Sequence, residues 1–311
     1  MAGETTECSF TLIISNCFVA EDGSLVINKT KLEKTAIATV IDTATTITGS
    51  GSEGVFIDGR TVTLSPYSIG KYEVTQELFE AIMGENPSKF QGGSYPPTDE
   101  EIQALRPVET IMWDYAIVFC NRLSILMGLE PCYTAIQTNG DEVPYESIAL
   151  STITQDCSTW QGVFCDFTKN GYRLPTEAEW EFAARGGDQN ATDWNYTYAG
   201  SNDDLDSVAW YYGNSINKTH EVGKLVPNRL GLYDMSGNVY EWCWDLYSSS
   251  ISDNTPATGP STGSNYYRCK RGCGYVGSSD SESYECSSRN GAGQYTTSNT
   301  EIGFRLARTI K

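Results

Sequence analysis

The first fifty residues alternate between short apolar runs and polar turn residues. Three runs are rich in β-branched and apolar residues, which is typical of short strands. They are FTLIISNCFV, SLVINKT and TAIATVIDTATTIT. The turn residues 21–23 separate the first two runs, and the Gly/Ser-rich run 49–54 has the composition of a flexible connector. We therefore expect an N-terminal β-rich segment over residues 1–50 and a domain over residues 54–308.

Residues 55–74 predict a hairpin, and helical periodicity follows. The dipeptide Asp58-Gly59 has the composition of a hairpin turn. In residues 74–84 the apolar positions share one helical face, with Thr75 as the expected N-cap and Gly84 as the exit. Residues 113–128 show the same spacing. Two helices are therefore expected early in the domain.

The rest of the chain has few long periodic segments. Residues 176–187 predict a third helix, because Thr176 and Glu179 have the spacing of a capping box. Gly, Asn, Asp, Ser and aromatic residues dominate from about 130 to 300, and the run 302–308 (IGFRLAR) then reads as a buried strand. Helices followed by short strands and long loops predict the α+β class.

Charge limits the classes of partner. The chain has 21 Lys and Arg against 40 Asp and Glu, which gives a net charge of −19. Such a surface repels phosphates, so we expect no nucleic-acid ligand. No run of 18 apolar residues exists, and the N-terminus lacks the charged and apolar regions of a signal peptide. We therefore expect membrane association only through a lipid anchor that this chain does not carry.

Ten cysteines and a single histidine restrict metal chemistry. None of the cysteines forms a CxxC pair, so the common zinc sites are not expected. An even number of cysteines is compatible both with disulfides in an oxidising compartment and with buried thiols. The sequence leaves both readings open.

Three long motifs carry a resemblance to a known family. GYRLPTEAEWEFAARGG (171–187), NRLGLYDMSGNVYEWCWD (228–245) and the ends of 268–308 resemble the formylglycine-generating-enzyme family, also called the sulfatase-modifying-factor family. The residues YSIGKYEVTQELFEAIMGENPSKF (67–90) fit the front of the same domain, and the resemblance covers residues 54–308. It implies a variant of the C-type lectin fold with two main helices, small β-sheets and much irregular but ordered chain.

The resemblance does not extend to the family's oxidase chemistry. In the family, two cysteines of the C-terminal motif bind copper and oxidise a substrate cysteine. Their positions fall at Gly277 and about Glu282, and Cys286 corresponds better to a structural cysteine. Without a thiolate pair there is no soft site for Cu(I). A related iron-dependent branch needs several histidines, whereas His220 is the only one here. We therefore expect no enzymatic activity and no required cofactor.

The resemblance implies a calcium site in LYDMSGNVYEW. In the family, the equivalents of Asp234, Gly237, Val239 and Glu241 hold a calcium ion, and oxygen ligands of this kind suit Ca²⁺. A structural calcium ion is therefore expected, and the alternative is a tight turn with a hydrogen-bonded aspartate. The aromatic residues of the motifs, including Trp180, are expected in the core.

Residues 272–300 have the composition of a binding loop. Gly, Ser, Thr, Tyr, Asn, Asp and Ala account for 22 of these 29 residues. Antibody loops favour Tyr, Ser, Gly and Asn because Tyr gives contact area at low entropic cost and the others adapt their hydrogen bonds. The segment also resembles the variable region of proteins diversified by retroelements, such as treponemal variable proteins, in which adenines of Asn-type codons mutate. Only Glu282, Glu285 and Gln294 are types that such mutation does not reach.

We therefore expect a surface-displayed binding protein whose variable region, about 272–300, contacts an unknown protein or other macromolecular ligand. The resemblance implies a cell-surface lipoprotein. The alternatives are an enzyme of unknown chemistry and a carbohydrate lectin on the same fold. Tyr275, Tyr284 and Tyr295 are the expected anchors, and four arginines (Arg268, Arg271, Arg289 and Arg305) are expected to hold the scaffold. The expected contact residues are Tyr275, Ser278, Asp280, Ser281, Tyr284, Ser287, Asn290, Gly291, Gly293, Tyr295, Thr296, Ser298, Asn299 and Thr300.

Overall fold

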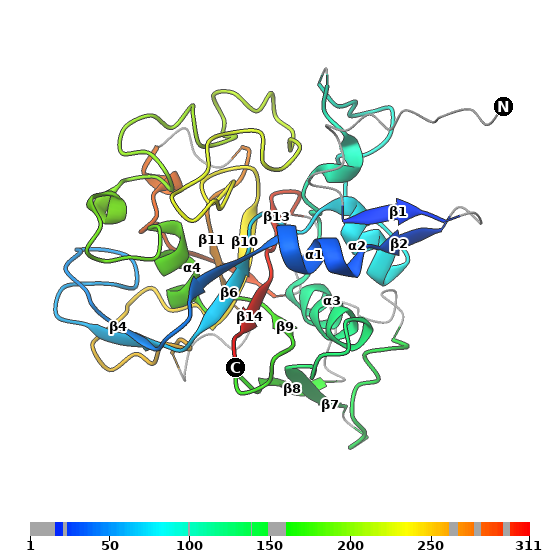
Figure 1. Cartoon of the computed structure of the whole chain (residues 1–311), viewed down its shortest axis with the longest axis horizontal. Helices are drawn as coiled ribbons and strands as arrows, with labels where there is room; N and C mark the ends of the chain where they lie inside the picture. The colour runs from blue at the N-terminus through cyan, green and yellow to red at the C-terminus, as the bar shows by residue number, and fades with distance from the viewer. Residues whose placement is uncertain are drawn as a thin grey trace.

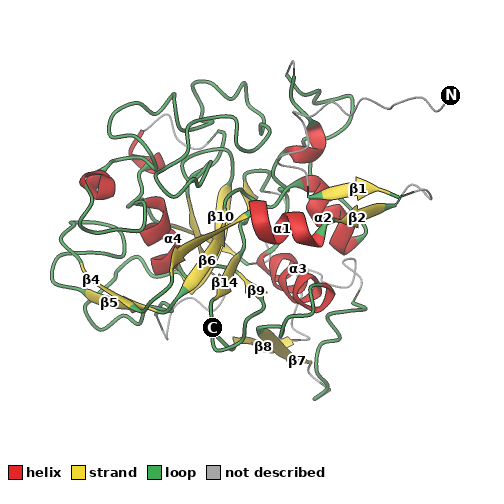
Figure 2. Cartoon of the chain, in the orientation of Figure 1, coloured by secondary structure: helices red, strands yellow, loops and turns green. Residues whose placement is uncertain are grey.

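The structure is a computed structural model of the 311-residue chain, and its described part contains two four-stranded sheets and three two-stranded sheets. The described residues are 16–20, 24–98, 100–137, 139–148, 160–260, 267–276, 281–294 and 299–311. Figure 1 shows the strands of the larger sheets between helix α4 on one side and helices α2 and α3 on the other. Figure 2 shows that loops connect most of these elements. The expected α+β class is confirmed.

One four-stranded sheet carries most of the C-terminal part of the domain. Its order is β12 (Asn290–Gly293), β11 (Tyr267–Arg271), β10 (Tyr240–Leu246) and β13 (Ile302–Gly303). The first three strands are antiparallel, and β13 runs parallel to β10. The polar stretch 272–300 therefore begins directly after β11 and contributes β12 to the same sheet.

The second four-stranded sheet brings strands from the first seventy residues beside the last strand of the chain. Its order is β3 (Ile37–Ile41), β6 (Tyr67–Gly70), β14 (Ala307–Thr309) and β9 (Tyr172–Arg173), with antiparallel neighbours throughout. The predicted strand over 302–308 is thus two short strands, β13 and β14, that belong to different sheets. The residues between them connect the sheets through the core.

The three predicted helices are present. They are α2 (Gln76–Met83), α3 (Trp113–Leu126) and α4 (Glu177–Ala184). The Thr75 side chain accepts a hydrogen bond from the backbone N–H of Leu78 and caps α2, and the predicted capping box begins α4. Both caps satisfy backbone N–H groups that have no partner inside a helix. Three 3₁₀ helices are also described: η1 (Gln103–Leu105), η4 (Thr192–Asn195) and η5 (Ser281–Tyr284).

The start of the chain differs from the expected run of strands. Strands β1 (Cys17–Val19) and β2 (Leu25–Ile27) lie within the first two expected runs and pair antiparallel, but helix α1 (Lys29–Thr35) follows directly. The Asn28 side chain accepts a hydrogen bond from the N–H of Lys31 and so begins this helix. Asn28, a polar cap residue inside the run SLVINKT, was the signal that favoured a helix here.

The predicted hairpin and the predicted boundary at residue 50 are both wrong. Strand β5 (Thr61–Leu64) pairs with β4 (Thr45–Thr48), so Asp58-Gly59 is a turn inside a longer connection. The run 49–54 is part of that connection, where the Gly49 N–H donates to the carbonyl of Arg60 at 2.7 Å. Because β3 and β4 pair with β6 and β5, the chain before residue 50 is not a separate structural unit.

Buried aromatic side chains fill the core around α3 and α4. Trp180 and Trp242 are fully buried, as predicted for the motif tryptophans. The indole N–H of Trp180 donates to Glu241 at 2.7 Å, and that of Trp242 donates to the carbonyl of Ile111 at 3.2 Å. The small sheet of β7 (Tyr133–Gln137) and β8 (Trp160–Cys165) lies beyond α3.

Candidate functional site

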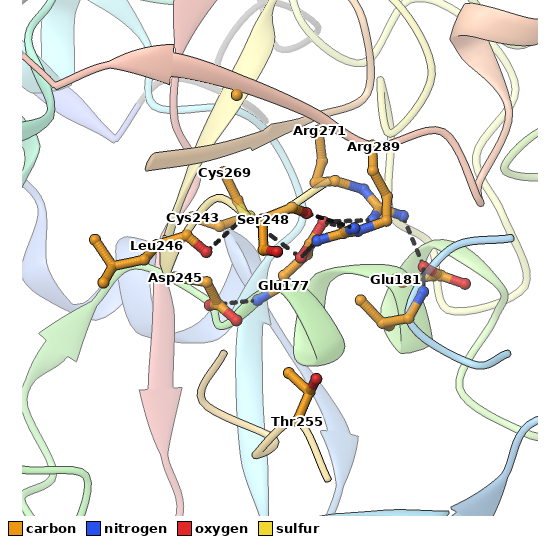
Figure 3. Close-up of polar contacts among 12 residues, drawn as sticks. Glu177, Glu181, Cys243, Asp245, Leu246, Ser248, Thr255, Cys269, Arg271 and Arg289 are labelled. Atoms are coloured by element: carbon orange, nitrogen blue, oxygen red, sulfur yellow. Dashed lines mark hydrogen bonds and ion pairs between the residues drawn. The ribbon is translucent and has the colours of Figure 1, made fainter. Parts of the chain in front are cut away.

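Two arginines of the C-terminal part bind one buried carboxylate at the start of α4 (Figure 3). The Glu177 side chain is almost fully buried, and Arg271 Nη1 donates to its Oε1 at 3.0 Å. Arg289 adds a bidentate contact, with Nε to Oε1 at 2.8 Å and Nη2 to Oε2 at 2.7 Å. Charge-assisted bidentate pairs of this kind fix geometry as well as contributing energy. Strand β11 and the chain before β12 are therefore tied to α4.

A second carboxylate extends this cluster. Arg271 Nη2 donates to Glu181 Oε2 at 2.8 Å, and the Val55 N–H donates to the same oxygen at 2.8 Å. Asp245 accepts from the backbone N–H of Glu177 at 2.8 Å. Burial and the nearby carboxylate of Glu177 raise the pKa of Asp245 well above its usual value. The cluster joins the loop before β5, helix α4 and strand β10.

Arg305 and Arg268 hold other parts of the scaffold. Arg305 is fully buried, and its Nε and Nη2 donate to the two carboxylate oxygens of Glu241, each at 2.6 Å. The Arg268 guanidinium lies 3.8 Å from the ring centre of Trp113 and donates to the carbonyl of Trp244 at 3.0 Å. The predicted scaffold role of the four arginines is therefore confirmed.

A groove with a volume of about 720 Å³ lies at the surface next to this cluster. Three segments line it: residues of the loop 51–58, residues of 247–251 after β10, and residues of 282–289 in the C-terminal stretch. Arg289 is one of the lining residues, and its contact with Glu177 ties the groove wall to α4. The groove thus combines part of the predicted variable region with two loops from elsewhere in the chain.

The groove is polar and carries negative charge. Serine hydroxyl groups occur on all three segments, and three carboxylates (Glu53, Asp58 and Glu282) line it. The charge of Arg289 is offset by Glu177 behind it. The groove can therefore donate and accept hydrogen bonds and attract positive charge. Among the described residues no group of three His, Cys, Asp or Glu side chains is placed to hold a metal ion.

Most of the described contact residues of the predicted face are accessible to solvent. Ser281 and Asn290 are exposed, and five others are partly exposed, with Ser287 in the groove wall, whereas the two described tyrosines are buried. The partly exposed residues are Ser287, Gly291, Gly293, Asn299 and Thr300. Five predicted residues lie outside the described residues: Ser278, Asp280, Tyr295, Thr296 and Ser298.

The prediction that Tyr275 and Tyr284 are exposed anchors is wrong. Their exposed fractions are 4% and 1%. The Tyr275 ring packs edge-to-face on Phe90 with centroids 4.9 Å apart, and its hydroxyl lies 2.8 Å from Thr300 Oγ1. The Tyr284 hydroxyl donates to the carbonyl of Gly274 at 3.2 Å. Tyr rings with satisfied hydroxyl groups suit a core as well as a binding loop, so composition alone did not separate the two uses.

The sequence did not point to two of the three segments that line the groove. The loop 51–58 has a Gly-rich composition that indicates a connector, but nothing in it indicates proximity to residues 282–289. The segment 247–251 is a run of Tyr, Ser and Ile after a core strand. The segment 247–251 follows β10, which pairs with β11, whereas the loop 51–58 is held to α4 by the hydrogen bond between Val55 and Glu181. A local pattern encodes neither contact.

The calcium site expected at Asp234, Gly237, Val239 and Glu241 stays a prediction. Both carboxylate oxygens of Glu241 bind Arg305, and one of them also accepts from Trp180. The guanidinium of Arg305 is a fixed positive charge beside any cation placed there, which is unfavourable. Oδ2 of Asp234 accepts from the N–H of Gly223 at 2.7 Å, whereas its buried Oδ1 has no hydrogen-bond partner among the described residues. We assign no role to calcium in this arrangement.

The cysteines near the stretch have the environment of structural thiols. All eight cysteines among the described residues are free thiols. Burial raises the pKa of Cys269 well above its usual value and that of Cys286 to about 12. Low thiolate content makes such groups poor nucleophiles and poor metal ligands. Of the two positions expected to correspond to the family's catalytic pair, Gly277 lies outside the described residues, and the second falls at about Glu282, which is exposed.

The family model of the sulfatase-modifying factor enzyme 1-like domain matches residues 29–310. The chain belongs to this family. The match begins at α1, before the expected domain start at residue 54, and agrees with the pairing of β3 and β4 with the domain. The predicted family and the predicted fold are confirmed.

Relatives in this family carry different names. A protein of Paenibacillus barcinonensis named chaperone protein LppX is 40% identical over 236 residues, which covers 70% of this chain and 72% of that protein. The formylglycine-generating enzyme of Thermomonospora curvata is 37% identical over 120 residues, or 34% of this chain and 39% of the enzyme. The alignment with that enzyme therefore spans less than half of its length.

A solved structure resembles most of this chain. Treponema denticola variable protein 1 superposes with a TM-score of 0.73 and 38% sequence identity, covering 86% of this chain and 95% of that protein. The predicted resemblance of this sulfatase-modifying-factor domain to a variable protein is confirmed. Within the described part of the chain, none of the helices has the length and apolar character needed to span a membrane.

Proposed function

We propose that this chain is a non-enzymatic ligand-binding protein whose C-terminal stretch, diversified by a retroelement, forms an exposed binding face. The observation that carries the proposal is that the residues of this stretch fall into two sets with different surroundings. Arg271, Tyr275 and Tyr284 are buried in the scaffold, whereas small polar residues such as Ser281 and Ser287 face solvent or the 720 Å³ groove. A rigid scaffold that presents replaceable side chains is the arrangement expected of a diversified binding protein.

The likeness to Treponema denticola variable protein 1 supports this function over catalysis. It extends over 86% of the chain at 38% identity, whereas the alignment with the Thermomonospora curvata enzyme covers 34%. The position equivalent to the second catalytic cysteine is Glu282, a groove residue without a thiol. The buried thiols nearby are poor candidates for copper binding.

The character of the groove favours a macromolecular ligand at the cell surface. It is wide and polar, and it is built from loops on three segments, which suits a protein surface better than a small apolar compound. The net charge of −19 disfavours nucleic acid. Surface display through a lipid anchor belongs to the same proposal, and it draws support from the likeness to LppX and to the variable protein.

Sequencing of the flanking DNA tests the diversification directly. A near-copy of the segment that encodes residues 268–305 is expected beside a reverse transcriptase gene. Mismatches between the two copies should be confined to adenines of the template copy. A locus with neither a copy nor a reverse transcriptase gene would remove the proposed diversification, and the enzyme and lectin alternatives would then be tested by substrate and glycan screens.

Brief protease treatment of intact cells tests the surface location. A surface-displayed chain should be lost from the cells while a cytoplasmic marker protein stays intact. Protection of the chain until the cells are lysed would contradict surface display.

A further inference from the structure

The loop after η4 and before β10 exposes two apolar side chains beside the proposed binding face. Ile216 has an exposed fraction of 73%, the largest among the large hydrophobic side chains of the described residues, and Tyr212 has 59%. Both belong to the segment 211–217, which lies outside the stretch expected to vary. Single exposed apolar residues are common and need no explanation. Apolar side chains that are exposed together are typical of interaction sites.

The backbone of this loop is strained at the exposed residue. Ile216 has φ of 53° and Asn217 has φ of 55°, both in the left-handed region. A β-branched residue is disfavoured there, because its side chain approaches the backbone, whereas asparagine tolerates the conformation. Strain of this kind persists only where the surroundings fix the backbone, and it is concentrated at functional sites.

Buried contacts on both sides of Ile216 fix the backbone. The Ser215 hydroxyl donates to the carbonyl of Tyr275 at 2.7 Å, and the carbonyl of Ser215 lies 2.8 Å from Nε2 of His220. Ser215 and His220 are both buried, and the His220 ring stacks on Trp210 at 3.9 Å. Ile216 is therefore held outward by neighbours that point inward.

The loop adjoins the helix that forms part of the groove wall. The Tyr212 N–H donates to the Tyr284 hydroxyl at 3.5 Å, and the rings of Tyr211 and Tyr284 lie 5.7 Å apart. Tyr284 ends η5, and the preceding residues Glu282 and Ser283 line the groove. The loop and the groove thus contact the same short helix.

The charge around the loop indicates which kind of partner fits. Asp203, Asp204 and Asp206 are exposed just before it, and Asp206 accepts a hydrogen bond from the Tyr211 hydroxyl at 2.7 Å. The segment 201–217 contains no lysine or arginine. Lys218, which follows the loop, donates to the carbonyl of Pro96 at 2.9 Å. Apolar side chains beside acidic groups are complementary to an apolar pocket with basic groups at its rim.

We propose that the loop 211–217 is an invariant part of the binding face, where Tyr212 and Ile216 enter an apolar pocket with a basic rim on a partner protein. The inference rests on the proposed binding function and adds the chemistry of the partner. The variable residues select among partners, and the loop supplies apolar contact that does not depend on them. Buried apolar anchors of this kind commonly dominate the affinity of an interface.

Binders selected from a display library test the inference. The probe is a phage-displayed library of a small three-helix domain with a randomised surface, selected against the wild-type chain. Most selected domains should carry apolar residues flanked by Lys or Arg. Their dissociation constants should rise at least about tenfold on Ile216→Asn and on Tyr212→Ser. The matched control is Phe164→Ser on β8, where an apolar side chain of similar exposure (67%) lies away from the loop.

The asparagine variant separates loss of binding from loss of folding. Asparagine tolerates the left-handed region, so Ile216→Asn should leave Tm unchanged or raise it while it weakens binding. Unchanged affinity on Ile216→Asn, or an equal loss on Phe164→Ser, would overturn the inference. A glycan array that shows binding sensitive to Ile216→Asn would also overturn it, because the partner would then be a carbohydrate.

A groove variant separates failure of this inference from failure of the proposed binding function. Ser287→Trp fills part of the groove and leaves the loop unchanged. Binders that lose affinity on Ser287→Trp but not on Ile216→Asn leave the groove as the binding site and reject the loop. Binders that are insensitive to both changes count against the binding face as a whole.

Discussion

Two sets of residues in the same C-terminal stretch have opposite surroundings. Arg271 and Tyr284 are almost fully buried and have partners on α4 and in the loops around η5, whereas Ser281 and Ser287 face solvent or the groove. Truncating a buried member leaves a charge or a cavity behind, but changing an exposed member removes little. A few long side chains therefore hold the stretch in place, and the small ones between them are free to change.

The sharpest test of this comparison removes Arg271. Arg271→Ala leaves the carboxylates of Glu177 and Glu181 buried with less compensation, and breaking a buried pair in this way costs about 3–5 kcal/mol. Urea denaturation should show a lower midpoint with an unchanged slope. Arg308→Ala is the matched control, because this half-exposed arginine lies 3.9 Å from Glu33 and should contribute less than about 1 kcal/mol. Equal losses of unfolding free energy for both variants would contradict the conclusion that the buried arginine holds the stretch in place.

Removal of a buried tyrosine should have the next largest effect. Tyr284→Ala deletes a ring that is 1% exposed, and the loss should be about 3 kcal/mol, the lower end of the range for buried aromatic rings. The comparison variant Tyr212→Ala removes an exposed ring from the neighbouring loop and should change the free energy of unfolding by less than about 0.5 kcal/mol. An equally small loss of unfolding free energy for Tyr284→Ala would show that this ring is not part of the core, and Tyr284 would again be a candidate for an exposed anchor.

Local patterns predicted helices α2, α3 and α4 and the scaffold arginines of this domain, but not helix α1. The start of α4 was visible because Thr176 and Glu179 satisfy each other's backbone groups within one turn. The scaffold role of Arg305 followed from its place in a core motif, but its pairing with Glu241 was not predicted, because Glu241 was expected to bind calcium. In each case the signal lies within a few residues or within a conspicuous motif.

Contacts between distant segments were not predictable in the same way. The run 49–54 looked like a linker because its composition is that of one, but β4 and β5 on either side of it pair with each other. Tyr275 was expected at the surface because of the composition around it. Its burial could not be foreseen, because its ring partner, Phe90, belongs to a segment far earlier in the chain. Strand register and ring packing depend on which segments meet, and composition does not specify that.

The buried carboxylates predict a pH dependence that the groove carboxylates do not share. Burial raises the pKa of Glu109 from 4.5 to about 7 and that of Asp234 from 3.8 to about 6. Between about pH 4 and pH 7 the folded state therefore binds more protons than the unfolded state, and stability falls as the pH rises through this window. Tm should be higher at pH 5 than at pH 8, and Glu109→Gln should flatten the curve. Asp58→Asn, in the exposed groove wall, is the control that should leave its shape unchanged.

The smallest expected effect concerns the exposed half of the comparison. Ser281→Tyr and Ser287→Asn, each a type that the proposed codon changes reach, should alter the free energy of unfolding by no more than about 0.5 kcal/mol. Neither serine is fully buried, and Ser287 makes only a local hydrogen bond to Glu285 at 3.2 Å. The same substitutions should change which domains of a display library bind, because they alter the shape and hydrogen bonding of the face. A loss above about 2 kcal/mol from either change would show that the small residues also hold the fold, and a stretch of that kind could not be rewritten freely.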